Sequence, residues 1–415
     1  MNEEQVSGGP CQVPAQVEEG LRQQAIGVDG PGTILRDFGA LLDLIGRGGL
    51  PTTGRRHLLP HSCLVELNAR LAQPLEVRLK RPQQRSYPNL DGLYLVGRAT
   101  GLIRARGTGA KGMLVVDETV RGSWDGLNPT EQYFTLLEAW LVHGRPGILG
   151  KGRDERYGSL FNCAMLWKSV PSRGLRLSKD MRCGRYLPGV ATEFHHLALM
   201  GMFGLLAVEQ DPAIAGEVWT PRALRRTAWG DAVFKLFEAA GVVWSAAGEA
   251  RRGEAAFGWL QGLFGRFFPA WQKNLMVPAP AFREGVFVFR VSLGRTRRLI
   301  ALSARRSLES LVAGILDAFG FDNDHLYSFT YTDRFGATVR ALHPYCEEPP
   351  STDEVFLGDL PLEQGEAMEF LYDFGDSWRF EVKLDRVEPL RAGFAQPVVL
   401  EAHGEAPPQY GRGEE

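Results

Sequence analysis

The hydrophobic pattern of this chain changes its period near residue 278. Before that point apolar residues recur every three or four positions, as in ILRDFGALLDLIG (34–46), which is the spacing of one helix face. After it they alternate, as in VFVFRVSL (286–293), which is the spacing of a strand with one buried face. We therefore predict a multidomain protein, mainly α-helical over 33–277 and α+β over 278–415.

Length and composition agree with a multidomain globular protein. A chain of 415 residues is longer than one ordinary core, and its 44% hydrophobic and 23% charged residues are typical of soluble proteins. No apolar run approaches the roughly 20 residues of a membrane helix. Residues 1–32 lack periodicity and are rich in Gly, Pro, Gln and Glu, so they are predicted to be a disordered leader.

The N-terminus and the cysteines indicate a compartment. The chain begins MNEEQ, with acids where a signal peptide carries Lys or Arg, and no apolar segment follows. Its five cysteines are scattered without the CxxC spacing of zinc or redox sites, which suits a reducing environment. We expect a cytoplasmic protein that does not enter the membrane.

The formal charge is −2, but it is distributed unevenly. Residues 41–125 hold 13 Lys or Arg against 7 Asp or Glu, a net of +6, whereas residues 285–390 hold 11 against 18, a net of −7. The basic part favours contact with a polyanion, and the acidic part favours a different partner.

The helical region is predicted to contain winged-helix-like elements. Helices expected at 34–46, 63–71 and 93–99 precede two short strand-like runs, LIRAR and MLVVD, which a glycine-rich link joins into a hairpin. Gly101 is a plausible end for the third helix. A similar layout follows, with a helix from His195, a strand after Gly204 and a long helix from 220 to Gly241, so two repeats, 33–150 and 151–277, are a further hypothesis.

The last third is predicted to be an α+β domain of β-grasp-like outline. Strands are expected over the following segments, with one amphipathic helix, capped by Ser307, after the second: 286–293, 297–303, 326–332, 366–373 and 378–387. The order β-β-α-β-β-β places one helix over a curled sheet.

Three separated segments carry a resemblance. AFGFDNDHLYSF, MEFLYDFGDSWRFEV and GEAPPQYG stand in the order and spacing of the plasmid pRiA4b ORF-3-like family, whose members also occur as passenger proteins of bacterial insertion elements. The resemblance covers 285–412, and the preceding part resembles the helical region often found before this domain. It implies a fold and a bacterial, mobile-element context but no reaction. Arg379 and Phe380 stand where the family usually has an acid and a histidine, so no role of that histidine is implied here.

The segment YDFGDSW allows two interpretations. As a tight turn, Gly375 would adopt a positive φ, Asp373 or Asp376 would accept backbone N–H bonds, and Phe374 and Trp378 would be buried. As a reactive site, the acids would hold a cation or transfer protons, as in a metal-dependent hydrolase or nuclease. The candidate residues are Asp322, Asp324, His325, Tyr372, Asp373, Gly375, Asp376 and Trp378. We favour the turn, and we predict no catalytic residue, metal ligand or cofactor.

A basic tract supplies the other candidate site. Its positive side chains could follow a phosphate backbone, with affinity from counterion release, or simply form a solvated face. The candidate residues are Arg78, Lys80, Arg81, Arg85, Arg98, Arg104, Arg106 and Lys111. The apolar third helix would equally suit a protein partner. We therefore predict a non-enzymatic binding or accessory protein that acts through nucleic-acid or protein contacts.

Overall fold

The protein is described here by a computed structural model, which covers residues 13–54, 56–107, 112–149, 158–177, 193–212, 216, 219–243 and 256–410. The chain divides into two compact units: Met1–Arg104 with Leu114–Pro278, and Ala105–Met113 with Ala279–Glu415. The multidomain prediction is confirmed. No helix in the described ranges is both long and apolar enough to cross a bilayer.

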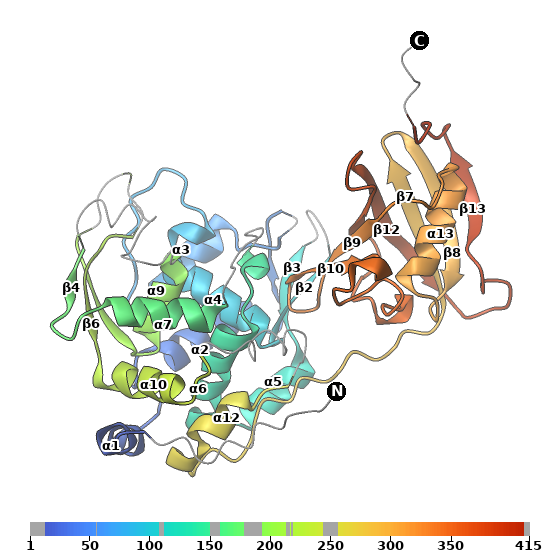
Figure 1. Ribbon diagram of the computed structural model, residues 1–415. Helices are drawn as coiled ribbons and strands as arrows, with labels where there is room; N and C mark the ends of the chain where they lie inside the picture. The colour runs from blue at the N-terminus through green and yellow to red at the C-terminus, as the bar shows by residue number, and fades with distance from the viewer. Residues whose placement is uncertain are drawn as a thin grey trace. The chain divides into compact units, whose positions relative to one another are not determined.

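Helices dominate the first unit, as predicted. Figure 1 labels them in chain order: α1 (Ala15–Gln23), α2 (Ile34–Ile45), α3 (His61–Arg70), α4 (Pro88–Ala99), α5 (Glu118–Asp125), α6 (Pro129–Glu138), α7 (Ser159–Ser169), α9 (Phe194–Met202), α10 (Ala228–Ala239) and α12 (Trp259–Phe264). Short turns of other helix types lie at η1 (Gln84–Ser86), η3 (Ala139–His143), η4 (Pro146–Leu149) and η5 (Gly265–Phe267).

Helix α4 forms the centre of this unit, and every one of its residues is buried. Two glycines allow its neighbours to approach. A Cβ at Gly92 would lie 2.7 Å from Leu199 Cγ of α9, and one at Gly97 would lie 2.4 Å from Ile103 Cδ1. The helix ends where predicted, because Gly101 follows it with a φ of 72°.

The segment predicted to be a disordered leader contains helix α1, which corrects that expectation. Val17 and Leu21 lie one turn apart on α1 and are both buried. Gly20 of the same helix lies close to Ala232 of α10, to whose Cβ a Cβ at position 20 would be 3.8 Å away. Two apolar residues are too few to predict a helix from sequence, but packing against α10 stabilises it.

Two small sheets accompany the helices. One contains β1 (Leu50–Pro51), β2 (Ile103–Arg106) and β3 (Met113–Val116) in the order β1-β3-β2, so the predicted hairpin is present. The other contains β4 (Leu175–Arg176), β5 (Leu206–Gln210) and β6 (Pro221–Arg226) in the order β4-β6-β5. The winged-helix assignment itself stays a prediction.

Strand β6 corrects the predicted helix from residue 220. Leu224 of β6 pairs with Leu175 of β4 and Val208 of β5, and it is fully buried. Helix α10 begins only after Thr227, whose side chain accepts the Gly230 N–H at 2.8 Å. The N-cap Thr227 therefore sets the start of the helix, and pairing with β4 and β5 holds the residues before it in an extended strand.

The second unit is an α+β domain built on one antiparallel sheet. Its elements are β7 (Val286–Leu293), β8 (Thr296–Ser303), α13 (Leu308–Phe319), β9 (Tyr327–Thr332), β10 (Thr338–Leu342), η6 (Pro344–Cys346), η7 (Leu357–Asp359), β11 (Ala367–Tyr372), β12 (Trp378–Glu388) and β13 (Val398–His403). The seven strands lie in the order β10-β9-β11-β12-β7-β8-β13, and α13 lies along the sheet (Figure 1). The α+β class is confirmed, whereas the β-grasp assignment stays a prediction.

Two strands of this sheet were not predicted, β10 and β13. Both are the outermost strands of the sheet, where a strand pairs with only one other strand of the sheet. Ala341 is the only fully buried residue of β10, and β13 is exposed over nearly its whole length, so neither shows the alternation that identifies a strand. Ser307 caps α13 as predicted, accepting the Ser310 N–H.

Candidate functional site

The acids of YDFGDSW lie in a turn that their own oxygens help to fix. Tyr372 at the end of β11 pairs with Trp378 at the start of β12. Between them, Asp373 Oδ1 accepts the Gly375 N–H at 2.8 Å, and the Asp373 carbonyl accepts the Ser377 N–H at 2.7 Å. These bonds close a short turn of the kind that aspartate favours.

The structure corrects two details of the predicted turn. Asp373 and Ser377 adopt the positive φ, at 53° and 58°, whereas Gly375 does not. An aspartate tolerates this conformation because its short side chain bonds to nearby backbone. Phe374 is not buried but exposed, with the Arg340 guanidinium 5.1 Å from its ring centre.

Trp378 is half-buried beside the core. Its ring meets the edge of Phe321 at a centroid distance of 5.2 Å. Its indole Nε1 is buried and has no hydrogen-bond partner among the described residues. Asp376 is exposed. Trp378 was predicted to be buried and is instead half-buried, packed against the core from one side, and Asp376 faces solvent.

The two predicted acidic segments do meet. The Tyr372 hydroxyl donates to the Asp322 carbonyl and lies 3.1 Å from Asp324 Oδ1. His325 lies between two carboxylates, with Nε2 3.5 Å from Asp324 Oδ1 and Nδ1 3.6 Å from Asp373 Oδ2. Segments about 50 residues apart in sequence therefore share one edge of the domain.

Two further residues complete this cluster, and neither was among the predicted site residues. The Tyr410 hydroxyl donates to Asp324 Oδ2 at 2.7 Å, and Gln409 Nε2 donates to Asp324 Oδ1 at 3.3 Å. The Asp322 N–H donates to Gln409 Oε1 at 2.5 Å. Both lie in GEAPPQYG, the third segment of the resemblance, so the motif itself was the signal that could have identified them.

These hydrogen bonds shift the protonation equilibria of the cluster. The bond from Tyr410 holds the pKa of the Asp324 carboxyl below its ordinary value. The same bond raises the pKa of Tyr410 to about 12, and burial raises the pKa of Tyr372. Asp324 is therefore an ionised acceptor whose two oxygens are both bonded. Within the described ranges, no three His, Cys, Asp or Glu residues are arranged to hold a metal ion.

Replacing Tyr410 with phenylalanine should raise the pKa of the Asp324 carboxyl toward its ordinary value of about 3.9. A carboxyl with a lowered folded-state pKa stabilises the protein above its unfolded-state pKa, and that stability is lost as the pH falls through the folded-state value. Tyr410→Phe should therefore lower the free energy of unfolding of the domain near neutral pH. It should also make that free energy fall less as the pH is lowered. NMR titration of the Asp324 carboxyl, with unfolding followed across acidic pH, measures both effects. Tyr345→Phe, at an exposed tyrosine, is the matched control; an equal response would contradict the assignment.

The basic candidates divide into different environments. Arg78, Lys80, Arg81 and Arg85 are exposed in the segment between α3 and α4, and Arg106 is exposed at the end of β2. Lys111 lies outside the described residues.

Arg98 and Arg104 are corrections to the predicted interface. Arg98 is buried on α4, where its Nη1 donates to the Tyr94 hydroxyl at 2.9 Å, so it cannot reach nucleic acid. Arg104 is half-buried and bonded to Asp117 at 3.1 Å. An arginine near the end of an amphipathic helix looks exposed in sequence, but α4 is enclosed on all sides.

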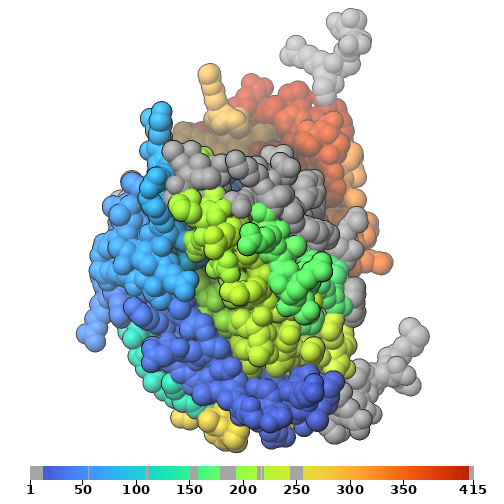
Figure 2. All heavy atoms as spheres, turned by 90° about the vertical axis from the view of Figure 1, so that its left-hand side faces the viewer, coloured from blue at the N-terminus to red at the C-terminus, as the bar shows by residue number. Residues whose placement is uncertain are grey.

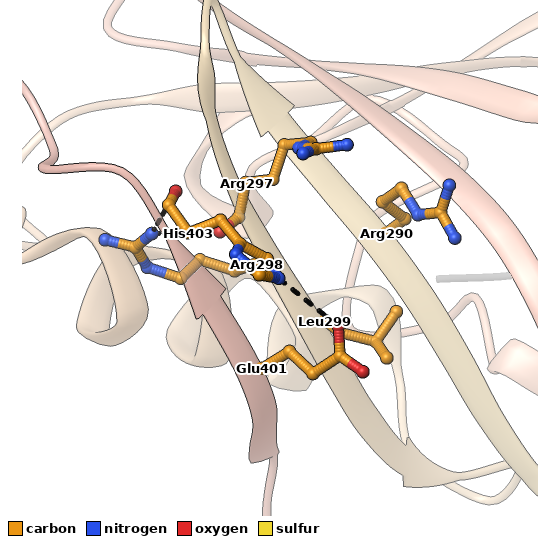
Figure 3. A pocket seen from close by; sticks show the side chains of 6 residues that line it. All are labelled: Arg290, Arg297, Arg298, Leu299, Glu401 and His403. Atoms are coloured by element: carbon orange, nitrogen blue, oxygen red, sulfur yellow. Dashed lines mark hydrogen bonds and ion pairs between the residues drawn. The ribbon is translucent and has the colours of Figure 1, made fainter.

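An open pocket of about 160 Å³ lies on strands β7, β8 and β13 (Figure 3), lined by Arg290, Arg297, Arg298, Leu299, Glu401 and His403. Much of its charge is matched within the domain. Arg290 bonds to Asp385 at 2.5 Å, His403 Nε2 lies 3.5 Å from Glu401, and Arg298 donates to backbone carbonyls. None of the predicted site residues lines this pocket.

By its fold and its site, the second unit is an antiparallel α+β domain in which hydrogen bonds from Tyr372 and Tyr410 to Asp324 join separate loops. Residues 286–413 match the family described as plasmid pRiA4b ORF-3-like protein, which confirms the resemblance over the C-terminal third. Uncharacterized protein y4hQ of Sinorhizobium fredii (strain NBRC 101917 / NGR234) is 34% identical over 94 residues, which cover 22% of this chain and 46% of that protein. The match thus spans less than half of that relative.

A solved structure is also similar in part. The crystal structure of a protein of unknown function, MM3350 from Methanosarcina mazei Go1, is 22% identical and has a TM-score of 0.28. The similarity covers 31% of this chain and 74% of that one.

Proposed function

We propose that this protein is a non-enzymatic bacterial accessory protein, associated with mobile elements, that binds nucleic acid through its first unit. The observation that carries the proposal is the segment containing Arg78, Lys80, Arg81 and Arg85, which we name the basic segment. All four side chains are exposed. Arg78 has a nearby acid, Glu76 at 2.6 Å, in a surface pair that is worth little in water and exchanges readily for a phosphate.

Buried residues fix both ends of the basic segment. At its start, Leu75 is buried, and its backbone N–H and carbonyl both bond to the Asn68 side chain at 2.9 Å. At its end, the buried side chain of Gln84 donates to Asp91 Oδ1 at 3.0 Å and accepts the Leu59 N–H at 3.0 Å. A loop held in this way loses less conformational freedom when it binds, so its charges are presented at low entropic cost.

The alternative is a metal-dependent hydrolase or nuclease at YDFGDSW and DNDH. That chemistry requires carboxylate oxygens available to a cation or a reacting water. Here Asp324 uses both oxygens on Tyr410, Tyr372 and Gln409, and Asp373 uses Oδ1 on its own turn. The arrangement supports a structural cluster, and the binding function is therefore preferred.

The test is a titration of the full chain with duplex DNA over a range of salt concentrations. A plot of log affinity against log salt has a negative slope, to which each phosphate contact contributes about −0.9. The variant Arg78→Gln/Lys80→Gln/Arg81→Gln should make this slope less steep by about 2 to 3. The control, Arg36→Gln/Arg47→Gln/Arg121→Gln, makes the same charge change elsewhere on the unit and should leave the slope unchanged. No binding at low salt, or equal losses in both variants, would refute the proposal. Cleavage of the DNA with added magnesium would instead support the nuclease.

A further inference from the structure

We propose that the nucleic-acid surface continues from the basic segment onto the sheet β4-β6-β5, where Arg176, Arg222 and Arg225 contact the phosphates of a duplex. This inference rests on the proposed function and extends it to residues that the sequence did not single out. It concerns a surface of the first unit alone.

The sheet holds its arginines outward from a buried inner face. Leu224 is fully buried between β4 and β5, which fixes β6 in the middle of the sheet. Arg225 directly follows Leu224 and its side chain is 62% exposed, whereas Arg222 stands where the register of β5 and β6 shifts and its side chain is 53% exposed. Arg176 of β4 pairs with Ala223 of β6, so it lies diagonally next to Arg225 and is also exposed.

The turn before β4 is shaped around one of these arginines. Gly174 has a φ of 87°, and a Cβ there would lie 2.9 Å from Arg225 Cγ. The stem of Arg225 therefore lies against the backbone of the turn, which limits its rotamers. Arg173 in the same turn is exposed. A guanidinium held by its stem binds phosphate with less loss of side-chain entropy than a free one.

The charge balance of the sheet is strongly basic. Residues 173–176, 206–210 and 221–226 contain five arginines and one acid, Glu209. Glu209 is shared by Arg222 at 3.2 Å and Arg225 at 2.8 Å, so it cannot neutralise both. Arg226 has a structural role, because it stacks on Trp167 at 4.0 Å and donates to the Trp167 carbonyl. The other four arginines are those that a polyanion could reach.

This sheet is continuous with the basic segment. The Gly216 N–H, in the connection between β5 and β6, donates to the Arg78 carbonyl at 3.1 Å. In Figure 2, light-blue residues near residue 80, yellow-green residues from the part of the chain that contains β5 and β6, and green residues from the part before them lie on the same face of the unit. The positive charges of the basic segment and of the sheet β4-β6-β5 are thus adjacent. Together they should bind a long polyanion more strongly than a single small anion.

The chemistry of the sheet favours duplex over single-stranded nucleic acid. Single strands are normally bound by stacking bases on exposed aromatic rings. Residues 173–177, 206–212 and 219–226 contain one aromatic residue, Trp219, and it is buried. Arginines without a stacking platform suit the regular phosphates of a duplex.

The experiment compares two variants of the full chain in fluorescence-anisotropy titrations with a short DNA duplex. Arg222→Gln/Arg225→Gln should make the negative slope of log affinity against log salt less steep by about 2, because two phosphate contacts are lost. Glu209→Gln should act in the opposite direction and tighten binding, because it removes the acid that competes with phosphate for the same arginines. Thermal unfolding of each variant should stay close to that of the wild type, since Arg222 and Arg225 are largely exposed and Glu209 is partly exposed in surface ion pairs.

The outcomes separate the two proposals. If the wild type binds and the basic-segment variant loses affinity, but both sheet variants bind like the wild type, the inference is overturned and the proposed function stands. If the wild type does not bind the duplex at low salt, the proposed function fails, and the inference with it. Equal binding of the duplex, a single strand and an acidic polypeptide would overturn the assignment to duplex phosphates.

Discussion

Replacing Glu138 with alanine is expected to lower the free energy of unfolding of the first unit by about 3 to 5 kcal/mol, because each buried donor left unpaired costs about 1 to 3 kcal/mol. The Glu138 side chain is 1% exposed. Its carboxylate accepts the N–H groups of Gly258, Trp259 and Leu260 at 2.9, 3.1 and 3.0 Å. These are the first N–H groups of α12, which lack partners within the helix.

Two variants control this prediction. Glu138→Gln keeps an acceptor oxygen but loses the charge, so its loss should be smaller than that of alanine. Glu66→Ala removes an exposed carboxylate paired with Arg70 and should change the stability by less than about 1 kcal/mol. Urea unfolding followed by tryptophan fluorescence reports chiefly on this unit, because eight of the nine tryptophans precede residue 279. Equal losses for Glu138→Ala and Glu66→Ala would contradict the capping role.

Replacing Phe380 with alanine is expected to destabilise the second unit by about 3 to 5 kcal/mol, the usual cost of deleting a buried aromatic ring. Phe380 is 1% exposed. Its ring lies 5.1 Å from that of Phe319 on α13 and 5.4 Å from that of Phe370 on β11. The ring thus joins the helix to the sheet, and its loss leaves a cavity between them.

Phe374 supplies the matched control for this prediction. It belongs to the same β11–β12 turn region but is 40% exposed, so Phe374→Ala should change stability by less than about 1 kcal/mol. Phe380→His places a polar ring in the same apolar cluster and should also destabilise the domain. Hydrogen exchange of peptides from 286–403 measures the second unit separately. Wild-type protection in Phe380→Ala would exclude the packing role.

The sequence alone determined the features that depend on neighbours in the chain. Alternation predicted the inner strands of the large sheet, Ser307 predicted the start of α13, and Gly101 predicted the end of α4. The same local reading found DNDH and YDFGDSW and anticipated that aspartate oxygens would fix the turn. Each of these features is set by residues within a few positions of one another, where side-chain chemistry limits the backbone directly.

Tertiary structure decided which residues are available and which segments meet. Arg98 is buried because other elements enclose α4, and β6 is a strand because β4 and β5 pair with it. Asp324 receives Tyr410 from 86 residues away, and Glu138 caps a helix that begins about 120 residues later. Such contacts leave no periodic pattern in the sequence, because each depends on the whole chain having folded around it.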